Sequence, residues 1–228
     1  MKKTYFIAGT DTSVGKTYAA CCLLEAAAKQ GLSTMGLKPV AAGCEFIDGS
    51  LKNEDALLLM KHMALALPYA QVNPVALKAA TSPHIAAHLE EKNVTVSRLV
   101  GFCRGALMQR PDFSLIEGAG GWRVPLNKRE TMADLARQLE FEVILVVSLK
   151  LGCLNHAMLS AEAIKRDGLT LAGWVGNRAS SSSMPFEDEN IATLRGALGA
   201  PLIGCLSYHE DPSPKLGCNE LNLDCLKM

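Results

Sequence analysis

One nine-residue segment near the N-terminus constrains the fold more than any other part of the chain. It reads Gly-Thr-Asp-Thr-Ser-Val-Gly-Lys-Thr over residues 9–17, and it follows the apolar run 5–8. Beyond it, apolar residues continue with helical spacing. A strand, a glycine-containing loop and a helix in this order are typical of a phosphate-binding loop, because backbone N–H groups at the helix start point toward the phosphates. The segment therefore predicts a βα unit that binds a nucleoside triphosphate.

The residue types in this loop suit that ligand. Gly15 lets the backbone approach the phosphates, Lys16 adds a positive charge, and Thr17 offers a hydroxyl group to Mg²⁺. The strict pattern would place a glycine at position 10, where this chain has Thr10, and the first glycine is Gly9. An ordinary strand–turn–helix connection is therefore the alternative.

Strands and helices are predicted to alternate along the rest of the chain. Six apolar runs are predicted as strands buried on both faces, at 5–8, 34–37, 113–116, 143–149, 171–175 and 202–206. Helical spacing is found at 16–30, 53–66, 97–110, 132–140, 155–167 and 187–198. This pattern predicts an α/β fold with a doubly wound, mainly parallel sheet and helices on both faces. Its ligand is expected beyond the carboxyl ends of the strands.

The length and composition fit a single domain of this kind. A chain of 228 residues that is 49% hydrophobic can bury one sizeable core, so residues 1–228 are expected to form one domain. Residues 209–228, which include Pro212, Pro214 and Gly217, are expected to be an irregular tail. The serine-rich segment 180–185 is expected to be an exposed loop.

Charge and hydropathy restrict the partners and the compartment. The 23 Lys and Arg residues balance the 23 Asp and Glu residues, which argues against nucleic-acid binding through counterion release. The first apolar run is too short for a signal peptide, and no run approaches the roughly 20 residues needed to cross a membrane. We expect a cytoplasmic protein whose eight cysteines are reduced and mostly buried; a metal or disulfide role is the alternative.

Polar residues follow several predicted strands, where the ligand is expected. Glu117 comes directly after the run 113–116 and before small residues, so it is a candidate Mg²⁺ ligand; a carboxylate that ends the strand before a flexible turn is the alternative. Asp55 begins a helical pattern and is either a second metal ligand or a helix cap. Lys38 follows the run 34–37 and is either a group that meets developing negative charge or an ordinary exposed lysine.

Two further polar segments leave their roles open. The run 150–156 leads into a predicted helix whose free N–H groups would suit a carboxylate, although Asn155 would more often be a helix cap. His84 and His88 lie four residues apart, a spacing that suits zinc on one helix face. No glutamate follows the first histidine, so surface or pocket-lining histidines are favoured.

Six segments, taken in order, resemble the dethiobiotin synthetase family. They are 9–17, 36–40, 81–84, 117–122, 150–156 and 173–177, and the resemblance runs from about residue 4 to about residue 208. It implies an ATP- and Mg²⁺-dependent ligase of biotin biosynthesis that makes dethiobiotin from 7,8-diaminononanoate and CO₂. One amine would take up CO₂ as a carbamate, the carbamate would attack the γ-phosphate of ATP, and the second amine would close the ureido ring.

The resemblance also implies roles for individual residues. Lys16 and Lys38 would be catalytic, and Thr17, Asp55 and Glu117 would hold Mg²⁺. The nucleotide would be bound by Thr12, Ser13, Val14, Gly15, Lys16, Thr17, Glu117, Gly118, Gly120, Asn177, Leu206 and Ser207. The substrate would be bound by Thr12, Lys38, Ala42, Gly152, Cys153 and Asn155. The turn 152–155 of one subunit is expected to bind substrate held mainly by the other subunit of a homodimer.

Two positions depart from the pattern of this family. Ser13 stands where many members carry an acidic residue, and Ala42 replaces a serine usually assigned a hydrogen bond to substrate. Loss of one neutral hydrogen bond costs on the order of 1 kcal/mol, which changes affinity without abolishing a reaction.

Two other classes of phosphate-loop protein are alternatives. Amidoligases of the cobyrinate or CTP-forming kind carry a glutaminase domain, for which 228 residues leave no room. Partitioning-type ATPases act by nucleotide-dependent dimerisation and place a second lysine early in the loop. This chain has Asp11 there and no lysine between Gly9 and Lys16, so the synthetase is favoured.

Overall fold

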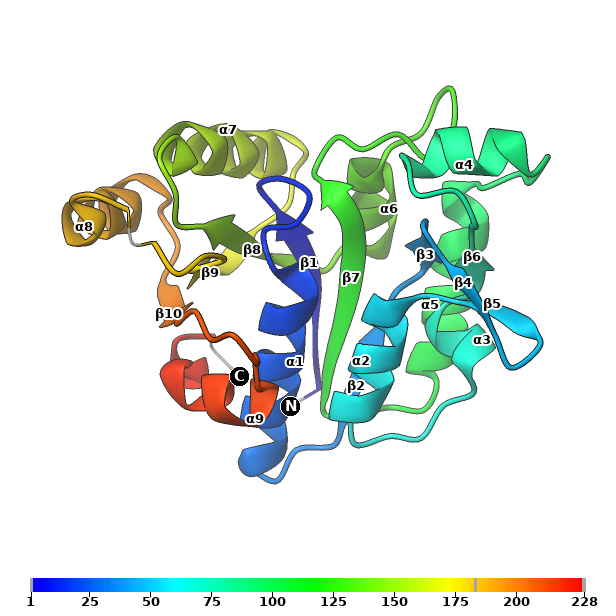
Figure 1. The fold of residues 1–228 in the computed structure, drawn as a ribbon, viewed down its shortest axis with the longest axis horizontal. Helices are drawn as coiled ribbons and strands as arrows, with labels where there is room; N and C mark the ends of the chain where they lie inside the picture. The colour runs from blue at the N-terminus through cyan, green and yellow to red at the C-terminus, as the bar shows by residue number, and fades with distance from the viewer. Residues whose placement is uncertain (1, 183, 227–228) are drawn as a thin grey trace.

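A six-stranded parallel sheet forms the centre of the computed structural model, which describes residues 2–182 and 184–226 (Figure 1). The strand order is β10-β9-β8-β1-β7-β2, and each neighbouring pair runs parallel. The strands are β1 (Lys3–Gly9), β2 (Thr34–Leu37), β7 (Phe113–Gly121), β8 (Glu142–Ser148), β9 (Leu171–Asn177) and β10 (Leu202–Leu206). The predicted fold class is therefore confirmed, and all six predicted strands belong to this sheet.

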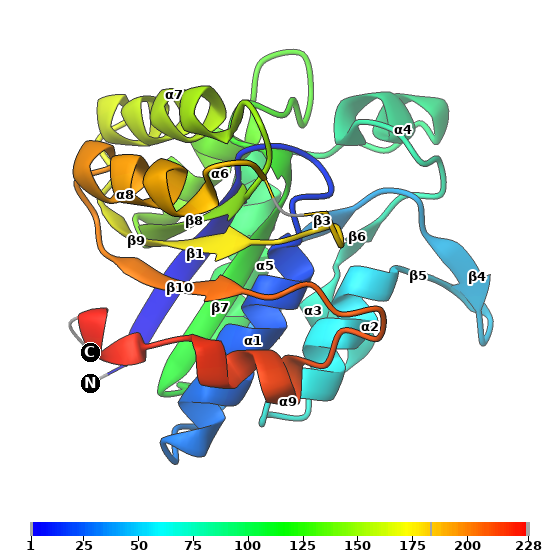
Figure 2. The ribbon, with the colours of Figure 1, turned by 60° about the vertical axis from the view of Figure 1, so that its left-hand side comes forward.

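Helices cover both faces of the sheet (Figure 2). On one face lie α1 (Lys16–Lys29) and α2 (Glu54–His62), and on the other lie α5 (Val96–Leu107), α6 (Met132–Leu139), α7 (Cys153–Arg166) and α8 (Glu187–Ala197). Each of these helices overlaps a predicted helix. Among the described residues, none of the helices has the length and apolar character that a membrane span needs.

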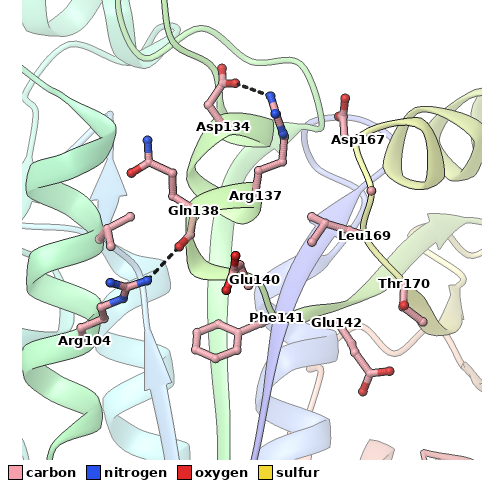
Figure 3. Close-up of a pocket in the computed structure, with 12 residues that line it drawn as sticks. Arg104, Asp134, Arg137, Gln138, Glu140, Phe141, Glu142, Asp167, Leu169 and Thr170 are labelled. Carbon is pink, nitrogen blue, oxygen red and sulfur yellow. Dashed lines mark hydrogen bonds and ion pairs between the residues drawn. The ribbon is translucent and has the colours of Figure 1, made fainter.

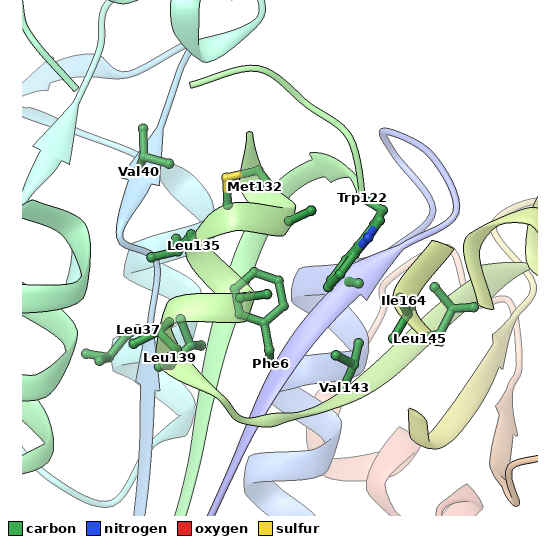
Figure 4. Close-up of a cluster of buried hydrophobic side chains, with 14 of the residues drawn as sticks. Phe6, Leu37, Val40, Trp122, Met132, Leu135, Leu139, Val143, Leu145 and Ile164 are labelled. Carbon is green, nitrogen blue, oxygen red and sulfur yellow. The ribbon is translucent and has the colours of Figure 1, made fainter. Parts of the chain in front are cut away.

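Strand β1 lies in the middle of the sheet and contributes to both hydrophobic cores. Tyr5 and Ile7 pack on the α1 side, whereas Phe6 packs on the α6 side, because successive residues of a strand point to opposite faces. Phe6 meets Trp122 edge-on with ring centroids 6.1 Å apart (Figure 4). With β7 on one side and β8 on the other, β1 delivers the segment after Gly9 to the centre of the sheet edge.

Short elements between β2 and α5 have no counterpart in the sequence analysis, apart from the helix that carries His84 and His88. They are β3 (Val40–Ala41), β4 (Glu45–Ile47), β5 (Ser50–Lys52), α3 (Tyr69–Val72), β6 (Val75–Ala76) and α4 (Pro83–Leu89). Strands β3 and β6 pair in parallel, and β4 and β5 form an antiparallel hairpin. These elements form a wall beside the carboxyl ends of β2 and β7 (Figure 1).

The C-terminal segment differs from the irregular tail that the sequence predicts. It contains α9 (Pro214–Gly217) and two 3-10 turns, Cys218–Glu220 and Leu223–Cys225, which pack against α1. Lys29 of α1 donates a hydrogen bond to Asn219 at 2.7 Å. Residues 227 and 228 of the predicted tail lie outside the described residues. Apolar side chains such as Leu223 anchor this segment in the core, which turn-forming residues alone did not indicate.

The loop after β9 and the cysteines largely follow expectation. Residues 180–182 and Pro185 are exposed, but Met184 is buried, with its sulfur 4.0 Å from that of Cys153; Ser183 lies outside the described residues. All eight cysteines are free, and six of them are buried.

Candidate functional site

A cavity of about 770 Å³ lies at the carboxyl ends of β1, β2 and β7. Its walls come from the loop before α1, the end of β2, the start of α2, the segment before α4 and the end of β7. The lining residues are Thr12, Ser13, Gly15, Lys16, Thr17, Lys38, Ala41, Ala42, Asn53, Asp55, Ala80, Thr81, Ser82, Pro83, Glu117, Ala119, Gly120 and Val124. The fold thus brings candidates from distant parts of the sequence around one space, at the edge where such sheets bind ligands.

The phosphate loop is held in a conformation that only glycine adopts easily. Gly15 has a φ of 86°, and a side chain there would collide with the amide of Asn177. That amide comes from the end of β9 and donates a hydrogen bond to the Val14 carbonyl oxygen at 2.9 Å. No side chain caps the start of α1, so its first-turn N–H groups have no side-chain acceptor. These features suit an anion.

Lys16 is buried at the floor of this loop. Its Nζ donates to the backbone carbonyl oxygen of Asp11 at 3.3 Å, and the Asp11 carboxylate accepts from the Thr12 N–H at 2.7 Å. Burial lowers the pKa of Lys16 to about 8, although the nearby Glu117 carboxylate opposes that shift. A phosphate group at this loop would favour the charged form of Lys16.

Lys38 is a buried member of an ion cluster. Its Nζ lies 2.5 Å from Glu117 Oε1 and 2.8 Å from Asp55 Oδ2, and the residue is only 4% exposed. The alternative of an ordinary exposed lysine is therefore wrong. Burial alone would lower the pKa of Lys38, but Glu117 and Asp55 outweigh it and raise the pKa above its ordinary value. Lys38 is thus held as a cation at the end of β2.

The oxygen atoms around this lysine fit a magnesium ion. Thr17 Oγ1 donates to Glu117 Oε1 at 2.8 Å, and Asp55 lies on the other side of Lys38. Glu117 Oε2 is buried without a hydrogen-bond partner, which is costly unless a cation or a donor satisfies it. Hydroxyl and carboxylate oxygens are the ligands that Mg²⁺ prefers. The Asp55 side chain pairs with Lys38, and Asn53 rather than Asp55 occupies the N-cap position of α2.

A chain of hydrogen bonds, which sequence reasoning missed, braces two walls of the cavity. The Asn53 N–H donates to Tyr69 Oη at 2.7 Å, and Tyr69 Oη donates to Asn73 Oδ1 at 2.9 Å. Asn73 Nδ2 in turn donates to the Lys38 carbonyl oxygen at 2.6 Å. The start of α2 and the end of β2 are thereby linked. The four-residue α3 that carries Tyr69 is too short to produce a periodic signal in the sequence.

Other predicted site residues lie outside this cavity. They are Val14, Gly118, Gly152, Cys153, Asn155, Asn177, Leu206 and Ser207. Val14 and Gly118 adjoin residues of the lining, and Asn177 and Leu206 end β9 and β10 on the other side of the phosphate loop.

The turn before α7 does not line the cavity of the same chain. Gly152 is the N-cap of α7 with a φ of 93°, and Asn155 lies exposed in the first turn of the helix. The alternative that Asn155 is the helix cap is therefore wrong.

His84 and His88 both lie in α4. Within residues 2–182 and 184–226, no group of three or more His, Cys, Asp or Glu residues could hold a metal.

A second cavity, of about 820 Å³, lies near the amino ends of β8 and β9 (Figure 3). Its charged groups are largely paired with protein atoms: Arg104 donates to the Gln138 carbonyl oxygen at 3.1 Å, and Arg137 lies 3.4 Å from Asp134. Although it is the larger of the two, it is away from the phosphate loop and from the ligand-binding edge of the sheet. The cavity at the phosphate loop is therefore the candidate site.

Known sequences match this chain over most of its length. A protein-family model described as an AAA domain matches residues 3–215. The ATP-dependent dethiobiotin synthetase BioD of Cellvibrio japonicus is 55% identical over 203 residues, covering 89% of this chain and 88% of that protein. The proteins of the same name from Marinobacter nauticus and Pseudomonas aeruginosa PAO1 are 51% and 49% identical, with 92% and 96% of this chain and 90% and 96% of those proteins covered.

Solved structures share the fold at much lower sequence identity. A ParA family ATPase from Chlorobium tepidum has a TM-score of 0.58 and 13% identity, with 92% of this chain and 87% of that one covered. The septum site-determining protein MinD of Pyrococcus horikoshii, solved with Mg-ADP, has a TM-score of 0.53 and 21% identity, with coverages of 95% and 85%. These similarities describe the architecture alone.

Proposed function

The chain belongs to the dethiobiotin synthetase family, and we propose that the cavity at the phosphate loop is where it makes dethiobiotin. It is an ATP-dependent ligase that forms carbon–nitrogen bonds, and its reaction is a step of biotin biosynthesis. The alternative of a partitioning-type ATPase has only a shared fold in its favour, because the ParA and MinD structures are 13% and 21% identical.

The proposed reaction has three steps. One amine of 7,8-diaminononanoate takes up CO₂ to form a carbamate, and a carbamate oxygen attacks the γ-phosphorus of ATP with release of ADP. The second amine then attacks the carbonyl carbon of the resulting anhydride, which closes the ureido ring and releases phosphate. The observation that carries this assignment is the pair of buried lysines, Lys16 at the start of α1 and Lys38 directly after β2, which line one cavity.

Both lysines suit a reaction whose intermediates are anionic. Lys16 would neutralise phosphate oxygens at the loop, and Lys38 would stabilise the carbamate and the transferring phosphoryl group. Burial strengthens such interactions, because little water remains to screen the charges. Thr12 and Ala42 line the same cavity and are proposed to contact the substrate.

We assign the metal to Thr17, Asp55 and Glu117, whose oxygen atoms fit Mg²⁺. When bound, Mg²⁺ would neutralise charge on the phosphate oxygens. Glu117 is held in place by the Thr17 hydroxyl and by Lys38, which also fixes Asp55.

The adenine is proposed to bind beside the phosphate loop at the ends of β9 and β10. Asn177, Leu206 and Ser207 lie there, and Asn177 already contacts the loop through Val14.

We also propose that the protein acts in the cytoplasm, since its eight cysteines are free, as expected in a reducing compartment.

We further propose a homodimer in which the turn at 152–155 of one subunit binds the carboxylate tail of substrate held by the other. Gly152 starts α7 without a side-chain cap, which leaves N–H groups of the first turn for an anion. Large apolar side chains are exposed beside this turn, on α7 and at the N-cap of α8: Leu151 at 89%, Leu159 at 56% and Phe186 at 75%. Exposed apolar groups of this size on adjoining elements favour a protein partner.

A turnover assay tests the proposed function. Release of ADP and phosphate is expected to require both 7,8-diaminononanoate and bicarbonate, with little release when either is omitted. ATP hydrolysis that neither compound stimulates would contradict the assignment.

A further inference from the structure

Asn53 has an unusual place at the start of α2. It occupies the N-cap position, where an Asn side chain ordinarily accepts a hydrogen bond from the first turn, yet it makes no such bond. The residue is only 9% exposed and lines the cavity of the phosphate loop. Its Oδ1 atom is buried and has no hydrogen-bond partner. A buried acceptor without a partner is costly, so the side chain is held there at the expense of stability.

One contact indicates which way the side-chain amide of Asn53 points. The side-chain Nδ2 donates to the Ala42 carbonyl oxygen at 3.5 Å, while the backbone N–H donates to Tyr69 Oη at 2.7 Å. The reversed amide would place Oδ1 against that carbonyl, with two acceptors facing each other. The oxygen therefore points away from Ala42, which itself lines the cavity and has no polar side-chain atom.

Asn53 is also one of the neutral polar residues in a cavity that contains a charged cluster. Asp55 lies two residues further along α2, and Lys38 is bonded to Asp55 and Glu117. Lys38 and Asp55 are already paired, and Glu117 is paired through Oε1 only. The Asn53 oxygen is thus an uncharged and unused acceptor on a residue that lines the same cavity as the cluster assigned to the metal and the anionic intermediates.

We propose that Oδ1 of Asn53 accepts a hydrogen bond from the substrate amine that closes the ureido ring. This inference rests on the proposed function and adds a substrate-binding residue to it. In ring closure the amine nitrogen forms a bond to the carbonyl carbon, the carbon–oxygen bond to the phosphoryl group breaks, and the amine proton leaves with the phosphate. The amine must therefore keep its lone pair. An amide oxygen accepts one N–H of a neutral amine, whereas a carboxylate would stabilise the ammonium form.

Two substitutions separate this role from support of the helix. Asn53→Leu removes the acceptor and is expected to raise KM for the diamine about tenfold, with KM for ATP changed less than about twofold. Asn53→Asp keeps an oxygen in place and is a good N-cap residue, so it should fold and bind the diamine no more weakly. Its kcat is expected to fall at least about tenfold, because the carboxylate holds the amine protonated. Glu54→Gln, at an exposed neighbouring position outside the cavity lining, is the control and is expected to change neither constant.

Inhibition by monoamine analogues decides the question. If Asn53 contacts the ring-closing amine, Asn53→Leu should weaken inhibition about tenfold for whichever of 7-aminononanoate and 8-aminononanoate retains that amine, and it should leave inhibition by the other isomer unchanged. Equal effects on both isomers, no effect on either, or a matching loss of ATP affinity would overturn the inference. Absence of diamine-dependent ATP turnover in the unsubstituted protein would instead overturn the proposed function.

Discussion

Lys38 is held between two carboxylates inside the protein, and one of them is itself buried. Glu117 is 1% exposed, and Lys38 is 4% exposed. Removing one partner of a buried ion pair leaves the other charge without compensation, so a substitution here affects both folding and catalysis.

Lys38→Met is therefore expected to lower turnover at least about 100-fold while ATP affinity stays within about threefold. The reason is that Lys38 would act on the carbamate and the transferring phosphoryl group, while the phosphate loop holds the nucleotide. Steady-state kinetics together with fluorescence titration of ATP measure the two effects. A loss confined to ATP binding would contradict the assigned role.

The same substitution is expected to lower the free energy of unfolding by about 3 kcal/mol, because Glu117 is left buried and charged. Urea unfolding measures this free energy for Lys38→Met and for the double variant Lys38→Met/Glu117→Gln. The double variant should regain part of the lost stability, and strictly additive losses would show that the pair does not interact.

Lys16 links pH to nucleotide binding. Burial lowers its pKa from the ordinary value of 10.5 to about 8 in the folded protein. Between those two values the unfolded chain binds more protons, so the contribution of Lys16 to stability improves as pH rises from about 8 toward 10.5. Below about pH 8 the folded protein bears the full cost of the buried charge.

Phosphate groups should raise the pKa of Lys16 again, so ATP binding near pH 8 is expected to take up about half a proton. Calorimetry in buffers with different ionisation enthalpies measures this number. Lys16→Met, under conditions where it still binds ATP, should abolish most of the uptake. An equal uptake by this variant would assign the proton to another group.

At the scale of elements, the contact between the phosphate loop and the end of β9 positions the nucleotide site. Gly15→Ala would require a positive φ and would displace the Asn177 amide. It is expected to destabilise the protein by about 2 kcal/mol or more and to weaken ATP binding at least about tenfold.

Gly31→Ala provides a matched control for that prediction. Gly31 has a φ of 81°, but no atom lies within 4 Å of where its side chain would be. It should cost only about 1 kcal/mol and leave ATP affinity unchanged. Equal effects of the two substitutions on ATP binding would mean that the Asn177 contact is unimportant.

The main elements could be predicted because their signals are local. The runs that form β1 and β8 are apolar over their whole length, as strands buried on both faces must be. By contrast, β3 and β6 have two residues each, which is too few for a pattern. Helix α2 ends at His62 rather than residue 66, because the N–H groups of residues 64 and 65 bond to Thr34.

Spacing alone indicates the chemistry of the site only where its residues are consecutive, whereas Lys38, Asp55 and Glu117 are candidates because they follow predicted strands or begin a predicted helix. Gly15, Lys16 and Thr17 form a local motif whose chemistry is readable from spacing. Lys38 and Glu117 lie 79 residues apart, and nothing in the spacing of either one shows that they meet. Asn53 was missed for the same reason, since its importance depends on what its side chain does not contact.

At the scale of the whole molecule, the proposed homodimer makes the clearest prediction. Sedimentation should give a mass twice the 24.4 kDa of one chain. Leu151→Asp combined with Leu159→Asp should shift the protein toward monomer and raise KM for the diamine, because the partner's turn would be lost. Met108→Asp, at an exposed position at the end of α5, should change neither property. A fully active monomer would contradict the shared substrate site.

The most direct measurement follows carbon from bicarbonate into product. The protein is incubated with ATP, Mg²⁺, 7,8-diaminononanoate and bicarbonate labelled with carbon-13, and the product is analysed by mass spectrometry. We expect a cyclic urea that carries one labelled carbon at the ureido position, formed with one ADP per molecule. ADP formation without labelled cyclic urea would contradict the proposed function.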